Sequence, residues 1–461
     1  MKNLIVFIIL FTAGMGVQAQ SNLTLYNMEP IPQRLSVNPA LSPDCKWYMG
    51  TPGLSSNDFS FNSNAFSILK IGNSLGTRPN GAYVLNLIRS SEFLDQPTFV
   101  HIDMNQEWFN AGFRVRKSMF FLTVLEKVKT KISLPSDLLK LAFQGNSGPN
   151  VGYDFNFNFG LDVLHTRELV LGFNHTFLND RLTLGGTAKY IRGQNVIQTV
   201  NNDLRFRNNA ADLTFDVQAD IEINKYTPFL EDQMGVSTKQ RIFGNPNNSG
   251  FGLDLGASLD LNKRITLTAS IIDLGQIYWN DAQKIKSKKP GSTFSYQGIE
   301  HLISDSIGFQ NSFQNLSDTL LDIFALETTS TSFSTGLLGE FYMGANLSLN
   351  DRHNAGALVY GSFYKKQFYP AITFSWNSEF GRFMALSLSY TAMRENYSNF
   401  GLGLGLNFDA EQFYIASDNV SNAISGDQQN LRIRFGWNHT VGRKEWEEKQ
   451  EGQKGQKEEG Q

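Results

Sequence analysis

The sequence predicts an all-β protein: an antiparallel transmembrane β-barrel of about 14–16 strands with short helical insertions in its loops. Three observations predict this fold. The chain begins like an exported protein, apolar and polar residues alternate over long segments, and the connections between segments alternate between short and long. Phe (37 residues) and Gly (40 residues) are abundant, and no stretch after the start reaches the ~18 apolar residues of a spanning helix.

Residues 1–19 are predicted to be a secretory signal peptide. Lys2 supplies the positive start, residues 4–11 form an apolar core, and Val17-Gln18-Ala19 is a small-residue cleavage site. The only cysteine, Cys45, lies too far from this site to carry a lipid anchor. A single cysteine also rules out an internal disulfide, so we expect an exported chain that folds without one.

Composition limits the possible partners and domains. Without Lys2, 39 basic residues (one fewer than 40) and 43 acidic residues remain, a balance that gives no reason to expect nucleic-acid binding. No Pro/Gly/Ser-rich linker divides the chain. We therefore expect an extended N-terminal lead-in over residues 20–45, one barrel over 46–442 with a long loop at 276–334, and a disordered polar tail over 443–461.

The clearest alternation lies in Gly250 to Trp279. Leucines at odd positions from Leu253 to Leu261 form one apolar face, which we expect to meet lipid, with Asp254 and Asp260 on the opposite, lumen-facing side. The polar turn at 262–264 is short, as in a β-hairpin. The chain is therefore predicted to repeat this amphipathic hairpin until it closes.

Other segments show the same period. Before the hairpin, strands are expected at 58–64, 98–105, 108–124, 152–163, 169–173, 181–191 and 212–223. After it, strands are expected at 341–349, 355–363, 369–376, 383–391, 400–408, 412–417 and 431–439. Residues 134–143, with Pro135 at the start, are predicted to form a short helix, and spacings of three and four over 302–324 predict one or two amphipathic helices.

The connections indicate which end faces the periplasm. Those at 350–352, 379–382 and 409–411 are short, whereas 392–399 and 418–429 are longer; only 365–368 breaks the trend. Outer-membrane barrels have short periplasmic turns and longer outer loops, so the short set is assigned to the periplasm, together with the carboxyl end. The tight Asn179-Asp180 turn does not fit this count, and the strand direction before residue 212 stays open.

Three motifs resemble a known family. They are LYNMEPIPQRLSVNPALSPD at 25–44, with Asn-Pro-Ala at 38–40; a pair of Asp-Leu-Gly elements at 254–256 and 273–275; and EQFYIASDNV at 411–420. Together they resemble a family of uncharacterised outer-membrane proteins of the Bacteroidota, distantly similar to FadL-like barrels and to the PorV and PorP/SprF barrels of type IX secretion and gliding.

This resemblance implies an outer-membrane barrel of about 14 strands and no known chemistry. The chain departs from the usual pattern at its end. In such barrels an aromatic residue closes the last strand at the carboxyl terminus, whereas the nearest candidates here, Phe435 and Trp437, lie well inside the chain.

Two motifs invite a functional interpretation. Gly72-Asn73-Ser74-Leu75-Gly76 matches the nucleophile-elbow pattern, but turn-forming residues follow Ser74 where a helix is required, which favours a plain loop. Gly401, Gly403 and Gly405 lie at period two, which favours the smooth side of a strand over a nucleotide-binding loop. Such a side would leave room in the lumen for a loop or for the lead-in.

The charged and metal-binding residue types give no site. The histidines are scattered, at positions 101, 165, 175, 301, 353 and 439. The acidic face over 212–222, with Asp212, Asp216, Asp220 and Glu222, could bind cations in a lumen, but a solvated wall is favoured. The basic run Lys284–Lys289 could touch lipopolysaccharide, but a solvated loop is favoured. No catalytic, cofactor-binding or metal-binding residue is predicted.

Three functions remain open. The favoured hypothesis is a non-enzymatic scaffold barrel in the outer membrane of a Gram-negative bacterium that docks partners in secretion or at the cell surface, because the loop expected at 276–334 is large enough to close a pore or recruit a protein. The first alternative is a FadL-like transport channel for small or hydrophobic solutes. The second is an exported soluble β-rich adhesion protein. Outer-membrane lipid and possible envelope proteins are the expected partners, and no feature identifies a substrate.

Overall fold

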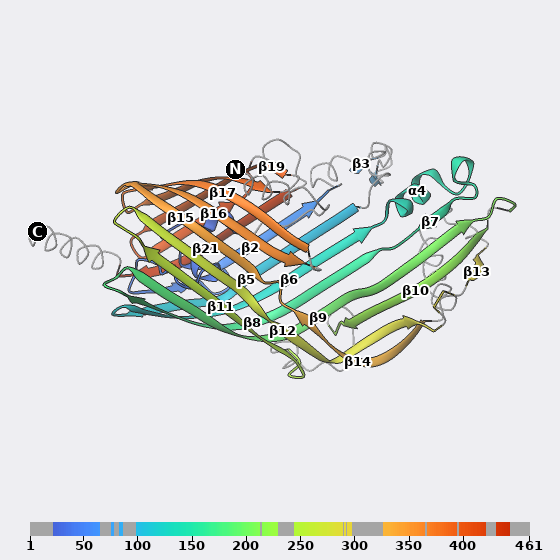
Figure 1. Ribbon diagram of the computed structural model, residues 1–461, viewed down its shortest axis with the longest axis horizontal. Helices are drawn as coiled ribbons and strands as arrows, with labels where there is room; N and C mark the ends of the chain where they lie inside the picture. Colours follow the sequence, from blue (N-terminus) through green and yellow to red (C-terminus); the bar gives the residue numbers. More distant parts are fainter. Residues whose placement is uncertain are drawn as a thin grey trace, which may run out of the picture.

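The computed structural model of the chain has one large antiparallel sheet that closes into a barrel (Figure 1). The structure describes residues 22–64, 75–77, 83–85, 98–212, 214–228, 244–288, 290–291, 293–296, 326–364, 367–393, 396–420 and 430–442. The predicted signal peptide, the predicted helices at 302–324 and the predicted tail lie outside the described residues. Among the described residues, no helix has the length and hydropathy needed to cross a bilayer.

The first and last strands close the barrel. β1 (Trp47–Gly50) and β2 (Ser56–Ser63) pair with β5 (Thr98–Val115) on one side and with β21 (Asn430–Val441) on the other. The other wall strands are β6 (Ser118–Leu134), β7 (Asp154–Asn156), β8 (Gly160–Phe177), β9 (Leu182–Asn208), β10 (Phe215–Tyr226), β11 (Asn248–Asp260), β12 (Ile265–Ser287), β14 (Leu326–Gly336), β15 (Glu340–Asn350), β16 (His353–Tyr364), β17 (Gln367–Phe380), β18 (Met384–Met393), β19 (Asn396–Phe408) and β20 (Glu411–Ser417). Beyond the wall, β13 (Thr293–Tyr296) pairs with β10, and β3 (Leu75–Thr77) pairs with β4 (Tyr83–Leu85).

Several strands are interrupted. β1 and β2, β7 and β8, β10 and β11, and β14 and β15 each follow one another along shared neighbours, so the described residues form a wall of 14 strands. The predicted strands 212–223 and 250–261 are consequently two pieces of one strand, since both β10 and β11 run antiparallel to β9. This continuity settles the strand direction before residue 212. The Asn179-Asp180 turn lies at the same end as the short turns at 261–264, 351–352 and 409–410.

The outer face of the wall is apolar. Leu253 and Leu255 are 44% and 49% exposed on the outside, whereas Asp254 is buried inside, so the predicted orientation of the hairpin is confirmed. Rings contact one another along the outer wall near the short-turn end, including Phe408 with Phe413 and Phe413 with Trp437. An apolar band edged by aromatic rings is the surface that a bilayer requires of a spanning barrel.

The barrel wall is much higher on one side. β9 has 27 residues and β12 has 23, whereas β18 has 10, and Figure 1 shows the long strands continuing well past the others. The predicted loop at 276–334 is therefore wrong over 276–287, 293–296 and 326–334, which are strand. The error has a physical cause: the outer half of β12 is charged, and β14 is rich in Thr and Ser, so neither shows an apolar face.

The one helical prediction within the described residues fares better than two of the strand predictions. The short helix over 134–143 is confirmed as α4 (Ser136–Gln144), which begins after Pro135. The predicted strand 108–124 is wrong, because a turn at 116–117 separates β5 from β6. The predicted strand 152–163 is broken between β7 and β8. Near α4, an apolar cluster that includes Phe155 and Phe215 packs the high side of the wall.

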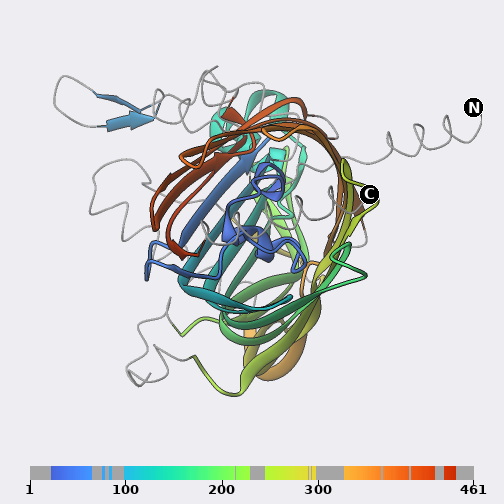
Figure 2. The same ribbon diagram turned by 90° about the vertical axis from the view of Figure 1, so that its left-hand side faces the viewer.

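Residues 22–45 fold inside the barrel, and we call them the plug. They contain α2 (Leu23–Tyr26) and a 3-10 helix, η1 (Pro32–Ser36), so the predicted extended conformation is wrong. Figure 2, which looks along the barrel from its short-turn end, shows this segment in dark blue surrounded by strands. The plug runs from the middle of the lumen to Lys46, whose backbone N–H donates to Val441 at that end.

Candidate functional site: a plugged lumen lined with charges

Apolar side chains of the plug pack against the inner wall on several sides. The plug members of these clusters are Leu23, Leu25, Tyr26, Met28, Ile31, Leu35, Val37, Leu41 and Cys45. Their partners come from β1, β6, β12, β15, β16, β17, β18 and β20. Since these strands are spread around the circumference, the plug closes the lumen near its short-turn end.

The glycines of β19 make room for the plug. A Cβ atom on Gly401 would lie 2.3 Å from the Thr24 Oγ1, and one on Gly403 would lie 2.5 Å from the Met28 Sδ. This confirms the interpretation of these glycines as the smooth side of a strand that admits the lead-in. At these positions of β19 the wall therefore has no side chains, and the plug occupies the space.

The Asn-Pro-Ala motif lies in contact with the hairpin. The Asn38 side chain donates to the Tyr26 hydroxyl (3.0 Å) and accepts the Ala40 backbone N–H (3.0 Å), which fixes the local turn. Its carboxamide faces Gly256 on β11, and the Pro39 backbone faces Gly185 on β9. Two of the motifs noted in the sequence, at 38–40 and at 254–256, therefore meet in the lumen.

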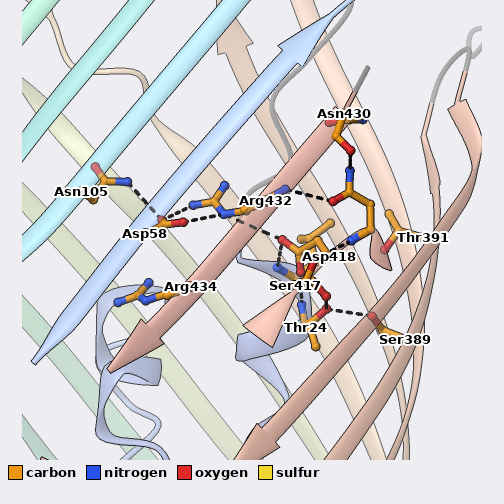
Figure 3. Close-up of polar contacts among 12 residues, drawn as sticks. Thr24, Asp58, Asn105, Ser389, Thr391, Ser417, Asp418, Asn430, Arg432 and Arg434 are labelled. Atoms are coloured by element: carbon orange, nitrogen blue, oxygen red, sulfur yellow. Dashed lines mark hydrogen bonds and ion pairs between the residues drawn. The ribbon is translucent and has the colours of Figure 1, made fainter. Parts of the chain in front are cut away.

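The first turn of the plug is anchored by the third motif (Figure 3). Asp418, which directly follows β20, accepts the backbone N–H groups of Leu23 (3.4 Å) and Thr24 (2.8 Å). Arg432 on β21 lies between two carboxylates: its Nε is 3.0 Å from Asp58 Oδ1 and 4.0 Å from Asp418 Oδ2. The start of the plug is thus held by a charged group that is itself fixed by a buried ion pair.

The same motif also replaces missing strand pairing. β20 is only 7 residues long, so it ends where β21 continues. There the Asn419 side chain accepts the Arg432 backbone N–H (3.0 Å) and donates to the Asn430 carbonyl. These bonds satisfy backbone groups that would otherwise be left unpaired inside the barrel.

A second group of contacts crosses the junction between the first and last strands. The Gln33 side chain of the plug donates to the Asn438 Oδ1 (2.8 Å) and to the Ser55 carbonyl (3.0 Å), and it accepts the Asn438 amide (3.0 Å). Beside it, Arg434 on β21 forms an ion pair of 3.1 Å with Glu107 on β5. The middle of the plug is therefore hydrogen-bonded to both edges of this junction.

The two Asp-Leu-Gly elements bring their carboxylates into one cluster. Lys189 lies 2.7 Å from Asp254 and 2.5 Å from Asp273, and Lys127 lies 3.3 Å from Asp273 and 3.1 Å from Glu168. A bulge in β12 turns Asp273 into the lumen with φ of 57°, and its backbone N–H donates to Asp254 (2.7 Å). The cluster links five neighbouring strands, β6, β8, β9, β11 and β12.

Beside the plug, inside the barrel, lies a cavity of about 120 Å³, which we call the outer cavity. Its charged lining residues are Asp58, Asp103, Glu107, Lys127, Lys129, Lys189, Asp254, Asp273, Glu340, Arg432 and Arg434. Gln33, Leu35 and Val37 of the plug contribute to its lining. The cavity therefore combines a charged wall with a boundary formed by the plug.

Glu222 of the acidic row (212–222) and Lys284 of the basic run (284–289) stand on β10 and β12, two neighbouring strands that pair with each other. Glu222 on β10 forms an ion pair of 2.7 Å with Lys284 on β12, and Lys286 pairs with Glu327 at 3.0 Å. Asp212 lies in a turn outside the wall, where hydrogen bonds from Thr214 lower the pKa of its carboxyl. The pairing of Glu222 and the turn position of Asp212 agree with the solvated-wall interpretation of the row, and Lys284 and Lys286 stand on a strand where a loop was predicted.

The remaining sequence candidates do not assemble. In the described ranges, no group of three His, Cys, Asp or Glu side chains is arranged to hold a metal ion. Ser74 and His301 lie outside the described residues. The residues after Ser74 form β3, a strand where a nucleophile elbow requires a helix.

The ion pairs of the lumen were not predicted. Lys127, Glu168 and Lys189 stand on three different strands, and a pairing between them depends on strand register, which a single sequence does not specify. A signal was present at Lys189, whose neighbours Ala188 and Tyr190 are apolar, whereas Lys127 and Glu168 follow the charged Glu126 and Arg167, which pair with each other. Charge on the inner side of several neighbouring strands marks a polar lumen.

A family model matches residues 39–418, most of the barrel and the end of the plug. The chain belongs to DUF5723, a family of unknown function. The matched range includes the Asn-Pro-Ala end, both Asp-Leu-Gly elements and Asp418. No curated protein sequence matches the chain.

Several solved barrel structures are similar to this one. They are a Pseudomonas aeruginosa FadL homologue (9% identity, 92% of this chain and 99% of the other, TM-score 0.45), the P. putida toluene transporter TodX (8%, 92% and 94%, 0.41) and a TodX deltaS2S3 mutant monoaromatic hydrocarbon channel (9%, 88% and 93%, 0.44). Sequence identities and TM-scores this low say nothing about any cargo of this chain.

Proposed function

We propose that the protein is an outer-membrane channel for polar solutes, closed by its own plug. The observation that carries this proposal is the bare stripe, the side of β19 on which Gly401 and Gly403 have no side chains. A separate segment of the chain fills the space that side chains would occupy there. A barrel needed only as a rigid support could fill its lumen with wall side chains. Here the barrier is a segment of chain that hydrogen bonds hold in place.

The lining of the outer cavity supports polar cargo. A hydrocarbon entering it would strip water from charged groups without replacing their hydrogen bonds, which is costly. A solute with its own polar groups keeps those interactions. The toluene and monoaromatic hydrocarbons named for the TodX structures are therefore not proposed for this chain.

Location in the outer membrane rests on two independent features. The predicted signal peptide sends the chain out of the cytoplasm, and the apolar outer wall suits a bilayer. The same wall argues against the soluble adhesion protein, which would expose side chains such as Leu171 (57% exposed) and Phe113 (53% exposed) to water.

A reversible cross-link between plug and wall tests the proposal. The Thr24 Oγ1 and the Ser389 Oγ on β18 are 2.8 Å apart, so Thr24→Cys with Ser389→Cys places two thiols in contact. In liposomes, the oxidised protein should pass no arabinose or glycine, and reduction should restore the swelling rate of the unmodified protein. Each single variant, treated with the same oxidant, controls for reaction at Cys45.

A variant lacking residues 22–44 gives the complementary result. If this variant migrates as a folded, heat-modifiable barrel, it should conduct strongly. A folded variant that conducts nothing would reject the channel, as would equal swelling of the cross-linked protein in its oxidised and reduced states.

The scaffold hypothesis keeps one specific observation in its favour. The high side of the wall, with β9, β10, β12 and α4, extends past the other strands and offers a surface that solute passage does not require. We infer that this surface is where a scaffold would dock its partner. Purification from native outer membrane of the protein and of a variant lacking residues 209–214, at the tip between β9 and β10, would test it: a partner lost only from the variant supports docking, and none retained by either rejects it.

A further inference from the structure

Most charges around the outer cavity compensate one another. Arg432 pairs with Asp58, and Arg434 pairs with Glu107. Lys189 and Lys127 share the carboxylates of the Asp-Leu-Gly cluster. The Glu340 carboxylate accepts the Tyr342 hydroxyl at 2.8 Å. Paired groups of this kind shape the cavity but leave little charge for a ligand.

Two lining residues differ from the rest. Asp103 on β5 and Lys129 on β6 are directly opposite in the strand register, and both line the cavity. Neither forms a hydrogen bond or an ion pair within 4.0 Å with any other residue that the structure describes, although Asp103 lies in the field of Lys129 and Arg432. One carboxylate and one ammonium are thus left side by side facing the cavity.

Their height in the lumen separates them from the plug. Glu107, which bonds to Gln33 of the plug, is four residues from Asp103 along β5, roughly 13 Å at the usual rise of a strand. A solute bound at Asp103 and Lys129 would therefore lie on the outer side of the plug, in the part of the cavity that a solute arriving from outside the cell would reach first.

We propose that the outer cavity binds a small zwitterionic solute of about the size of a dipeptide, with its carboxylate against Lys129 and its ammonium against Asp103. This inference rests on the proposed function and names the class of cargo. A zwitterion satisfies both groups and adds no net charge. An anion would meet Asp103, and a cation would meet Lys129, so either is repelled by one member of the pair.

Calorimetric titration of the full-length protein in detergent tests this without any variant. Glycylglycine carries both charges, N-acetylglycylglycine lacks the ammonium, and glycylglycinamide lacks the carboxylate. Glycylglycine should bind about tenfold more tightly than either blocked form, equivalent to one added charge contact. Equal affinities for the three, or no binding of glycylglycine, would overturn the proposal.

Variants then assign the two ends. Asp103→Asn should weaken glycylglycine to the level of the N-acetyl form, and Lys129→Gln should weaken it to the level of the amide. The exchange Asp103→Lys with Lys129→Asp should restore binding, since the zwitterion can turn round. Asp154→Asn, which removes an exposed carboxylate paired with Arg207, is the matched control and should change nothing. An exchanged pair that binds as weakly as the single variants would reject the assignment.

Binding and passage are separate readouts. The titration is done with the plug in place and needs no flux, so glycylglycine binding without swelling would reject the channel and leave this inference standing. Swelling with arabinose but no preference for glycylglycine would support the channel and reject this inference.

Discussion

Gly256 and Asn38 fit against each other so closely that a side chain at position 256 has no space: a Cβ atom there would lie 2.1 Å from the Asn38 Oδ1. The contact joins a wall strand to the plug across 218 positions of sequence, the difference between their residue numbers. The first Asp-Leu-Gly element therefore has two uses in the lumen, with Asp254 joining the ion-pair cluster and Gly256 accommodating the plug.

Gly256→Ala should destabilise the plugged barrel. Asn38 would have to move and lose its hydrogen bonds to Tyr26 and Ala40, at a cost of about 1–3 kcal/mol for overpacking. The temperature at which the folded band disappears on a gel should fall. Gly336→Ala is the control, since a Cβ at 336 meets nothing within 4 Å. In the variant lacking residues 22–44, Gly256→Ala should have no effect; an equal loss there would show that the plug is not the cause.

Asp418→Ala should loosen the plug without unfolding the barrel. The Leu23 and Thr24 N–H groups lose their acceptor, and Arg432 keeps its pair with Asp58. Single-channel recordings should show more frequent opening than for the unmodified protein. Asp212→Ala removes a carboxylate from a turn outside the wall and should open as often as the unmodified protein. Identical traces from Asp418→Ala and the parent would mean that this carboxylate does not hold the plug.

Removing one member of the buried ion pair of Asp58 and Arg432 should destabilise the barrel more than removing both. Asp58→Leu removes a carboxylate that lies 3.0 Å from the buried Arg432 guanidinium, and breaking a buried pair in this way costs about 3–5 kcal/mol. The double variant Asp58→Leu, Arg432→Met removes both charges and should recover much of that loss. Urea unfolding of the parent, of Asp58→Leu, of Arg432→Met and of the double variant in lipid vesicles gives the cycle. A double variant as unstable as the sum of the singles would contradict this account.

Leu171→Arg should weaken insertion into the bilayer. Leu171 lies on the outer wall beside Phe120 and Phe173, and an arginine on the lipid face costs roughly 2–4 kcal/mol near the membrane midplane. The fraction that folds into vesicles should drop. Asp216→Arg, on the high side of the wall, provides a matched arginine away from this band and should fold normally. Equal folding of the two would place Leu171 outside the bilayer.

Period-two patterns predicted much of the wall from the sequence. The hairpin of β11 and β12, the last six strands and the orientation of Asp254 all follow from alternation. Alternation failed where a strand has no apolar face, as in the Thr- and Ser-rich β14, and where two pieces of one strand are separated by a long excursion, as between β10 and β11.

The lumen could be predicted only in outline. The bare stripe at 401–405 indicated that something fills the barrel, and the inward charges indicated a polar interior. The contacts themselves depend on side chains up to 405 positions apart, as for Gln33 and Asn438, and on the bulge that turns Asp273 inward. Strand register and bulges cannot be predicted from residue spacing. The three motifs could therefore be found in the sequence, but the contacts between them could not be predicted.

The position of Gln33 sets an order of events during biogenesis. Its hydrogen bonds reach the loop after β1 and the last strand, β21, and those two elements become neighbours only when the cylinder closes. The plug therefore completes its contacts last, after insertion has brought the chain's two ends together. A barrel stalled half-open on the assembly machinery would lack this site, and its plug would remain accessible to periplasmic proteases. Protection of the plug from digestion thus reports that closure is complete.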